Sequence, residues 1–243
     1  MLDAGAPIIQ FSFGIPSSEW VASIKRAGAK TGVQVSNVDG ARRALDLGAD
    51  YLVCQGTEAG GHVQALSPLL QSLPKIIAEA KSVPVVAAGG LTTGLDVRRV
   101  LTAQASGALM GTRFLATKES AGNAAHKAEL LRAIGDDTVL TICFQDGWLY
   151  PHRVIRNRTI EMWEGAGCPP PGRRPGEGDV TGTYPAANGT MTERRRYWVN
   201  MPRPNEVGQI DEQPLYAGTG VGAVRDLPPA GELVARLWKV CTG

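Results

Sequence analysis

The stretch Tyr51–His62, YLVCQGTEAGGH, decides the fold of this chain. Its first half is a short apolar run without polar–apolar alternation, which is typical of a strand buried on both faces of a sheet. Its second half contains the consecutive glycines Gly60 and Gly61, whose backbone can take positive φ angles and approach a ligand closely. A buried strand that passes into such a loop predicts a βα unit, and α/β folds build their sites in these loops.

Four further apolar runs repeat this pattern along the first half of the chain. They are Pro7–Phe13, Gly32–Ser36, Val83–Gly90 and Ala108–Phe114. Apolar residues at helical spacing fill the gaps, for example from Leu66 to Ala80, and a fifth helix is expected over Ala124–Ile134. Strand–helix repetition implies parallel strands joined by right-handed crossovers. The sequence therefore predicts an α/β fold with five βα units, and periodicity alone leaves a barrel and a doubly wound sheet both open.

The alternation of strand and helix patterns ends after Gly135. Phe144–Trp163 mixes aromatic with charged side chains, Gly165–Gly182 is rich in proline and glycine, and a last amphipathic helix is expected near Gly231–Cys241. This half is too aromatic to be a disordered tail. We therefore divide the chain into a partial barrel, residues 1–134, and a C-terminal cap, residues 135–243, which packs on the barrel.

Composition excludes several classes of protein. The formal net charge of +2 gives no reason to expect nucleic acid or an anionic membrane as a partner. The four cysteines are widely scattered, so neither a zinc site nor a disulfide framework is predicted, and no other metal is expected. Met1–Pro7 lacks the pattern of a signal peptide, and no stretch is apolar enough to span a membrane. A cytoplasmic location is expected.

Three features at strand ends are able to carry chemistry. His62 ends the glycine-rich loop, and its pKa range suits a general base near neutral pH. A loop histidine bonded to a backbone carbonyl is the alternative. Gly89-Gly90 follows the fourth run, and Met110-Gly111-Thr112 lies in the fifth. In barrels the loops after the last two strands often bind phosphate through backbone N–H groups. A tight turn is the alternative for the glycine pair.

Other polar and aromatic residues are weaker candidates. His126 lies in an expected helix and is predicted at the surface, and His152 is predicted to be structural. The run Arg194–Arg196 indicates a solvated face or partners for carboxylates. Trp148 and Trp163 would either close over a substrate or, as the more frequent case, pack within the cap.

Together these segments resemble the nitronate monooxygenase family. The residues that carry the resemblance are QGTEAGGH (Gln55–His62), VPVVAAGG (Val83–Gly90) and GALMGTRFLAT (Gly107–Thr117), in family order and at family-like spacing. FQDGW (Phe144–Trp148), RVIRN (Arg153–Asn157) and LYAGTGVG (Leu215–Gly222) extend it over nearly the whole chain. The resemblance implies a TIM (β/α)8-type barrel that binds FMN.

The resemblance also implies a role for each matching residue. His62 falls where the family places its catalytic base. Gln34, Gln55 and Gly60 fall at positions that line the flavin, and a donor at Gln34 would stabilise negative charge on the reduced ring. The FMN phosphate loops match a longer set: Gly89, Gly90, Leu109, Met110, Gly111 and Thr112.

The implied reaction is the oxidation of an alkyl nitronate, or of a nitroalkane after deprotonation, by FMN and molecular oxygen to a carbonyl compound and nitrite. The alternatives are an NAD(P)H-dependent reductase of the quinone or enoyl-acyl-carrier-protein type on a related flavin barrel, and a non-catalytic fragment that binds no flavin. The wording GTEAGGH and the long cap favour the first reading.

The resemblance predicts a barrel truncated to its last five βα units, because the last two visible strands carry the phosphate motifs. Pro7–Phe13 then corresponds to the fourth strand of the barrel. An open sheet would expose strand edges. We therefore expect that a partner closes it, that the protein forms a homo-oligomer, or that the sequence is a fragment of a longer product, which is the leading explanation.

Overall fold

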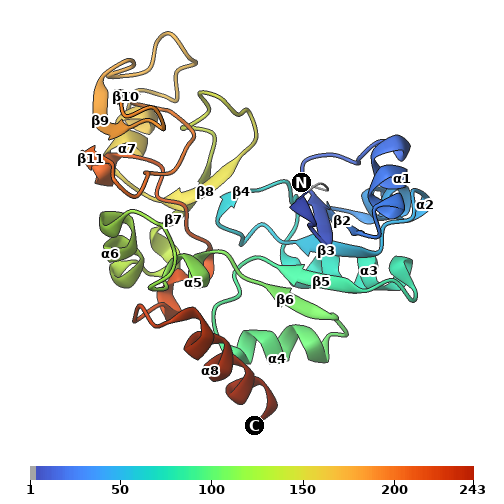
Figure 1. Cartoon of the computed structure of the whole chain (residues 1–243). Helices are drawn as coiled ribbons and strands as arrows, with labels where there is room; N and C mark the ends of the chain where they lie inside the picture. Colours follow the sequence, from blue (N-terminus) through green and yellow to red (C-terminus); the bar gives the residue numbers. More distant parts are fainter. Residues whose placement is uncertain (1–3) are drawn as a thin grey trace. The chain divides into compact units, whose positions relative to one another are not determined.

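The computed structural model describes residues 4–243, which form two compact units (Figure 1). Unit 1 contains the described residues up to Glu58, Gln64–Met110 and Leu237–Gly243, and unit 2 contains Ala59–Val63 and Gly111–Arg236. The expectations that concern Met1–Asp3, within the predicted barrel and the stretch without a leader pattern, lie outside the described residues. The predicted domain division at residue 134 stays a prediction.

Unit 1 is built on a five-stranded parallel sheet with the order β1-β2-β3-β5-β6. The strands are β1 (Ile8–Phe11), β2 (Lys30–Val35), β3 (Tyr51–Gln55), β5 (Val85–Ala88) and β6 (Gly107–Leu109). Their register aligns Gln55 with Ala88 and Ala88 with Leu109, so the carboxyl ends of the last three strands lie level. The parallel α/β sheet and the five strands predicted from the apolar runs are confirmed.

Four helices connect these strands: α1 (Ser18–Arg26), α2 (Val38–Asp46), α3 (Leu69–Ala80) and α4 (Gly94–Thr102). Their starts follow from capping side chains, such as Asn37, which accepts from the Gly40 N–H at 2.8 Å, and the Thr93–Asp96 capping box of α4. Gly28, with φ +74°, follows the end of α1 as a C-terminal stop. Helical spacing was predicted from Leu66 onward, but α3 begins after Pro68, so Leu66 lies outside the helix.

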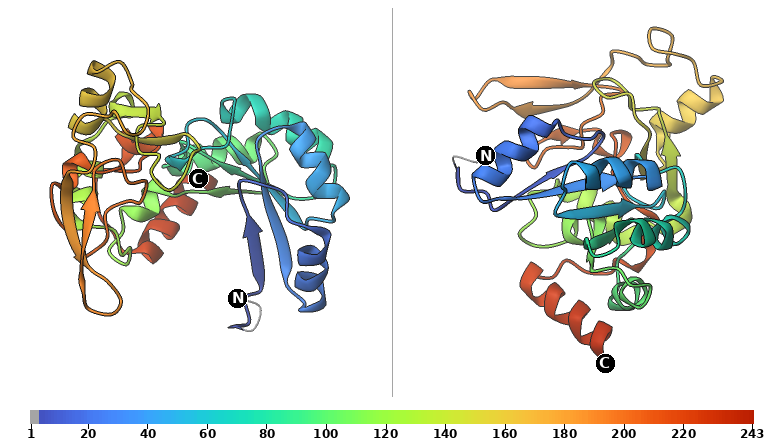
Figure 2. Two further views of the ribbon diagram at one scale, coloured as in Figure 1. Left: turned by 90° about the horizontal axis from the view of Figure 1, so that it is seen from above. Right: turned by 90° about the vertical axis from the view of Figure 1, so that its right-hand side faces the viewer.

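All four helices pack on the same face of the sheet (Figure 2). Val33, Leu52 and Val85 lie in one core with buried residues of α2, α3 and α4. Ile9 of β1 packs with Ile24 of α1, and the parallel register turns it to the same side. Helices on one face are the arrangement of a barrel wall, whereas a doubly wound sheet is covered on both faces.

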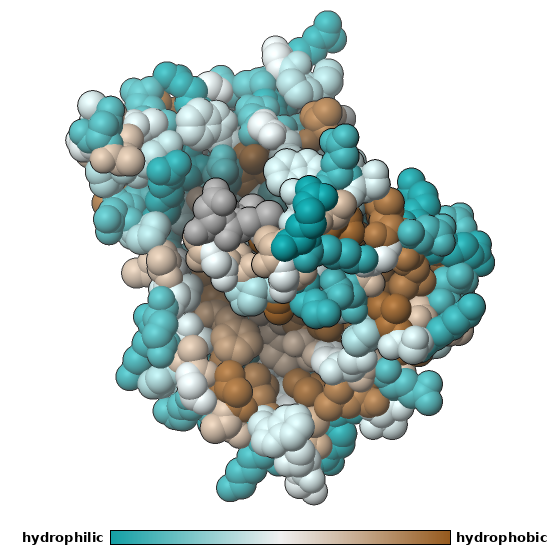
Figure 3. All heavy atoms as spheres, turned by 45° about the vertical axis from the view of Figure 1, so that its right-hand side comes forward, coloured by the Kyte–Doolittle hydropathy of each residue, from teal (hydrophilic) through white to brown (hydrophobic). Residues whose placement is uncertain are grey.

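Among the described residues this sheet stays open between its edge strands β1 and β6. Both edge strands carry exposed apolar side chains, with Ile8 53% and Leu109 40% accessible. Figure 3 shows hydrophobic side chains at the surface of one side of the molecule. Residues 4–243 thus contain five parallel strands without barrel closure, and the truncated barrel stays a prediction.

The fifth predicted strand is too long in the sequence interpretation. Ala108–Phe114 was expected to be extended, but β6 ends at Leu109 and a short helix, α5 (Thr112–Leu115), begins after Gly111. The glycine therefore separates a strand end from a helix start, although the apolar run continues through both.

None of the helices in residues 4–243 has the length and apolar character needed to cross a lipid bilayer.

Unit 2 contains two small antiparallel sheets. One has the order β4-β8-β7, from β4 (Gly61–His62), β7 (Thr138–Thr141) and β8 (His152–Ile155). The other has the order β10-β9-β11, from β9 (Val180–Pro185), β10 (Met191–Arg195) and β11 (Val207–Gly208). Besides α5, its helices are α6 (Ala124–Arg132) and α7 (Arg158–Gly165), with 3-10 turns at Gly135–Asp137, Ile210–Glu212 and Thr219–Ala223. The last helix, α8 (Ala230–Thr242), begins in unit 2 and ends in unit 1.

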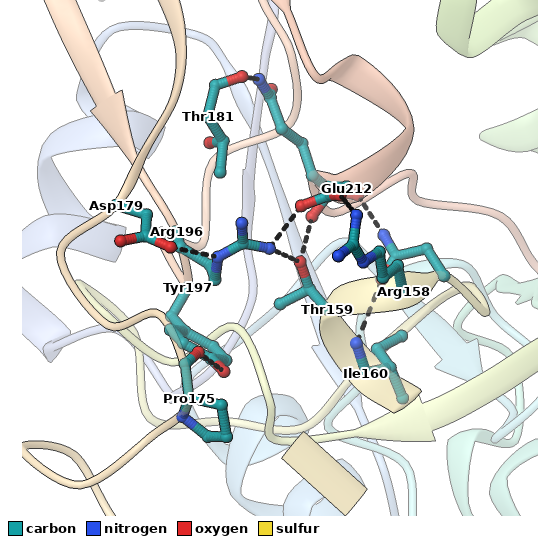
Figure 4. A network of polar contacts seen from close by, with 11 residues as sticks. Arg158, Thr159, Ile160, Pro175, Asp179, Thr181, Arg196, Tyr197 and Glu212 are labelled. Atoms are coloured by element: carbon teal, nitrogen blue, oxygen red, sulfur yellow. Dashed lines mark hydrogen bonds and ion pairs between the residues drawn. The ribbon is translucent and has the colours of Figure 1, made fainter. Parts of the chain in front are cut away.

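Buried ion pairs hold the irregular segments of unit 2. Arg194 is fully buried against the buried carboxylate of Glu206, with Nε–Oε1 at 2.5 Å and Nη2–Oε2 at 2.9 Å. Arg196 reaches Glu212 and the hydroxyl of Thr159 (Figure 4). A solvated face is therefore wrong for Arg194 and Arg196, which partner carboxylates, whereas Arg195 is half exposed.

Replacing Arg194 with methionine would leave the Glu206 carboxylate buried without its counter-ion. We expect Arg194→Met to lower the free energy of unfolding by about 3–5 kcal/mol, the usual cost of breaking a buried ion pair from one side. The neighbouring variant Arg195→Met is the matched control and should stay within about 0.5 kcal/mol of the wild type. Urea denaturation measures both, and equal losses would contradict a stabilising role for the Arg194–Glu206 pair.

Candidate active site

The carboxyl edge of the unit 1 sheet gathers most of the predicted cofactor residues. Gln34 and Gln55 are buried near the ends of β2 and β3. Gly89 and Gly90 directly follow β5, and their φ angles of +112° and +69° are ones that glycine takes without strain. Leu109 ends β6 opposite Ala88, the residue before the glycine pair, and Met110 follows it. The parallel pairing thus places these residues along one edge.

A network of glutamine side chains lies at the same edge. The Gln64 N–H donates to Oε1 of Gln55 at 2.9 Å, and Nε2 of Gln64 donates to the backbone oxygen of Gln34 at 2.9 Å. Oε1 of Gln64 accepts from the Phe13 N–H at 2.7 Å. Gln64 and Phe13 were not among the predicted site residues, because a single glutamine or phenylalanine carries no periodic or motif signal.

Glu58, inside the glycine-rich motif, caps a helix. Its carboxylate accepts from the Leu69 N–H at 2.9 Å at the start of α3, where Pro68 provides no side-chain cap. A carboxylate there satisfies an orphan donor and opposes the positive end of the helix dipole. A side chain at Gly56 would overlap Glu58 and Leu69, since an added Cβ would lie 2.5 Å from the Leu69 nitrogen. This part of the motif therefore shapes the loop.

His62 lies in unit 2, on the short strand β4, opposite His152 of β8. Its half-buried imidazole contacts three rings edge-on, with centroids at 5.4 Å for Tyr216, 5.6 Å for Trp148 and 6.1 Å for His152. Burial lowers the pKa of His62 below the ordinary histidine value. The imidazole is therefore neutral near pH 7, the state that a proton acceptor requires.

His152 and His126 are buried and hold the surroundings of His62. The Phe144 N–H donates to Nε2 of His152 at 3.2 Å, so the ring proton of His152 is on Nδ1. This Nδ1–H donates to the Tyr150 carbonyl at 3.3 Å. Nε2 of His126 donates to the Tyr216 carbonyl at 3.1 Å. The surface position expected for His126 is wrong, because the residue is fully buried. The contacts of His152 fit its expected structural role.

The two tryptophans that the sequence singled out differ. Trp163 is buried, and its indole donates to the Pro169 carbonyl at 2.9 Å. Trp148 is 39% accessible and contacts the His62 ring. Packing therefore accounts for Trp163, and Trp148 is the one of this pair that stands beside the candidate base.

Three further predicted site residues, Gly60, Gly111 and Thr112, lie in unit 2. Gly60 lies against the backbone of Ala217-Gly218, where an added Cβ would approach the Gly218 nitrogen to 2.3 Å. The Thr112 hydroxyl accepts from the Gly218 N–H at 3.0 Å. An added Cβ at Gly111 would meet open space. The segment LYAGTGVG thus fixes the backbone beside two of these three residues.

The structure divides the predicted site residues between its two units. Unit 1 holds Gln34, Gln55, Gly89, Gly90, Leu109 and Met110, and unit 2 holds Gly60, His62, Gly111 and Thr112. Within residues 4–243, no three His, Cys, Asp or Glu side chains converge as a metal site would require.

Comparison with known proteins identifies the family. The family model for nitronate monooxygenase matches residues 1–239. The chain belongs to the nitronate monooxygenase family. This confirms the family inferred from the glycine-rich motifs.

Curated relatives agree with this assignment. A probable nitronate monooxygenase of Bacillus subtilis is 37% identical over 243 residues, covering 93% of this chain and 62% of the relative. A (3aS,4S,5R,7aS)-5-hydroxy-7a-methyl-1-oxo-octahydro-1H-indene-4-carboxyl-CoA dehydrogenase of Mycobacterium tuberculosis is 35% identical over 166 residues, covering 68% of this chain and 45% of the relative. The chain thus spans about half to three fifths of the length of these relatives.

A solved structure extends the comparison. A nitroalkane oxidase from Streptomyces ansochromogenes superposes with a TM-score of 0.74 at 29% identity, covering 99% of this chain and 65% of that one. The similarity in both sequence and structure supports the same family.

The buried histidines predict a loss of stability in acid. Burial lowers the pKa of His126 and of His152 from 6.5 to about 4. As the pH falls through this interval, the unfolded chain binds protons that the folded chain does not, so folding stability decreases. The decrease reaches about 3 kcal/mol for each imidazole. We expect His126→Gln to make the free energy of unfolding fall less steeply with decreasing pH, measured by urea denaturation across this range. An unchanged pH slope would contradict the assignment.

Proposed function

We propose that this protein oxidises alkyl nitronates, and nitroalkanes after deprotonation, with FMN and molecular oxygen, giving a carbonyl compound and nitrite. The observation that carries the proposal is the half-buried His62, whose lowered pKa keeps it neutral, in a chain of the nitronate monooxygenase family. The B. subtilis relative, a probable nitronate monooxygenase, supports the same reaction.

The residues present fit an FMN group. The positive φ angles of Gly89 and Gly90 and the open space beside Gly111 leave backbone N–H groups accessible to phosphate oxygens. We propose that these residues, with Leu109, Met110 and Thr112, hold the phosphate. Gln34, Gln55 and Gly60 are proposed to line the ring, where amide donors stabilise negative charge. FMN, when bound, supplies the oxidation and returns electrons to oxygen.

His62 performs the proton step. A neutral imidazole nitrogen accepts the proton from the carbon next to the nitro group, and the nitro oxygens carry the resulting negative charge. The rings of Tyr216, Trp148 and His152 limit access of water to the imidazole. These contacts also limit its rotation, so the accepting nitrogen keeps one direction.

The proposal also includes the barrel fold, the partners and the cellular location of this protein. Helices on one face of five parallel strands support a (β/α)8-type barrel. The exposed apolar side chains of both edge strands support contact with a further chain segment or a second copy in a homo-oligomer. Small-molecule substrate and oxygen are the proposed partners, and the cytoplasm is the proposed location.

A reductase or dehydrogenase is the second candidate. The M. tuberculosis relative, a carboxyl-CoA dehydrogenase, favours it, since it matches this chain at 35% identity. NAD(P)H oxidation in the absence of nitronate separates the two: a steady rate supports the reductase, and oxygen consumption with nitronate alone supports the monooxygenase.

His62→Asn tests the base. We expect this variant to lose nitroalkane oxidation by at least about 100-fold, the usual contribution of a positioned general base, while nitronate oxidation falls far less because a nitronate is already deprotonated. Nitrite release from paired substrates measures both. Equal losses on the two substrates would remove His62 from the proton step.

The lowered pKa of His62 predicts the pH profile. The basic form of the imidazole is the active one, so kcat/KM for a nitroalkane should stay level as the pH falls to the ordinary histidine pKa and decline only below it. The nitronate reaction is the control and should lack this acidic limb. A limb centred above the ordinary histidine pKa would contradict the burial of His62.

A further inference from the structure

The residue just beyond β1 has an unusual backbone conformation. Phe13 has a φ of +60°, in the left-handed region that bulky side chains seldom occupy. Such a conformation persists only where surrounding contacts hold it, and it is frequent at functional sites. One contact that holds the Phe13 backbone is the 2.7 Å hydrogen bond from its N–H to Oε1 of Gln64.

Gln64 joins three neighbouring strands at their carboxyl ends. Its side-chain oxygen binds the Phe13 N–H after β1, and its side-chain nitrogen binds the Gln34 carbonyl in β2. Its own N–H binds Oε1 of Gln55 at the end of β3. Both ends of one amide and the adjoining backbone are used, so no other orientation of this amide gives the same bonds.

The third bond sets the direction of the Gln55 amide. A backbone N–H can only donate, so it selects the oxygen end of the Gln55 side chain. The same rotamer turns the amino end of Gln55 in the opposite direction. Gln55 is 6% accessible, and a buried amide held in this way loses little rotational entropy when a ligand binds.

We propose that Gln64 is a positioning residue of the flavin site: it holds Phe13 and Gln34 at the strand ends and turns Gln55 so that its N–H donors face the cofactor. This inference rests on the proposed FMN site and extends it to a residue outside the family motifs. A donor at Gln55 binds the electron-rich edge of the ring and stabilises the charge that the ring gains on reduction.

Two variants separate bonding from packing at position 64. Gln64→Met keeps the length of the side chain but makes neither side-chain bond, and Gln64→Ala removes both length and bonds. We expect both to weaken FMN binding by about tenfold, in line with the loss of two hydrogen bonds. Gln71→Met, on the exposed side of α3, is the matched control. Quenching of FMN fluorescence gives the dissociation constant.

Amide hydrogen exchange tests the tether without cofactor. In the FMN-free protein, exchange at Phe13 should be faster in Gln64→Met than in the wild type, and exchange in α3 should be unchanged. If Phe13 exchanges in Gln64→Met at the same rate as in the wild type, the hydrogen bond from Gln64 does not hold the Phe13 backbone, and this part of the proposal is overturned. Wild-type FMN affinity in both Gln64 variants would overturn the positioning role.

Gln55→Glu tests which end of the Gln55 amide meets the flavin. A carboxylate still accepts from the Gln64 N–H but offers no donor, so the midpoint potential of bound FMN should become more negative. Gln71→Glu adds the same charge on exposed α3 and should leave the potential unchanged. An unshifted potential in Gln55→Glu would overturn the proposed orientation.

These outcomes are distinct from a failure of the proposed reaction. A wild type that binds FMN but does not oxidise nitronates sinks the reaction and leaves the Gln64 experiments intact. A wild type that oxidises nitronates, with Gln64 variants of unchanged affinity, sinks only this inference. A wild type that binds no FMN overturns the cofactor assignment, and Phe13 exchange still decides whether the tether exists.

Discussion

Parallel pairing of five strands is the constraint on which the rest of unit 1 depends. A parallel strand can return beside its neighbour only through a crossover, and here each crossover is a helix on the same face. All five carboxyl ends therefore meet at one edge. Gln55, Gly89 and Met110 come from three separate segments of the chain, yet the register sets them along that edge.

Unit 2 depends on a different kind of interaction. Its strands are short and its connections irregular, so apolar periodicity supplies less of its core. Buried guanidinium–carboxylate pairs join these segments, because a charge removed from water must find its counter-ion. Glu206 and Glu212 each accept from an arginine of the β10 region, so the end of this strand is tied to two later segments. The positions of these segments are thereby fixed without long elements.

Sequence patterns predicted the elements that local apolar periodicity encodes. They did not predict the contacts of side chains whose partners are distant in the sequence. The five strands were predicted correctly, because buried strands leave a local apolar signal. A carboxylate partner for Arg196 was one of two open alternatives, and Gln64 was overlooked, because their partners are remote in sequence or carry no motif. His126 followed the same rule: a helical histidine is usually exposed, and the Tyr216 carbonyl that binds its buried ring lies 90 positions away in the sequence. The division of the site residues between two units has no sequence signature.

The environment of His62 has two opposing effects on this residue as the proposed base. Burial among Tyr216, Trp148 and His152 lowers the pKa of the imidazole, which weakens it as a proton acceptor. The same burial favours the unprotonated imidazole at neutral pH, so the form that the proposed proton step requires predominates. A weak base suffices only where the carbon acid is itself unusually acidic, as it is beside a nitro group, whose oxygens take up the charge. The imidazole environment thus supports the proposed substrate, whose carbon is acidified by a nitro group, over an ordinary ketone or ester.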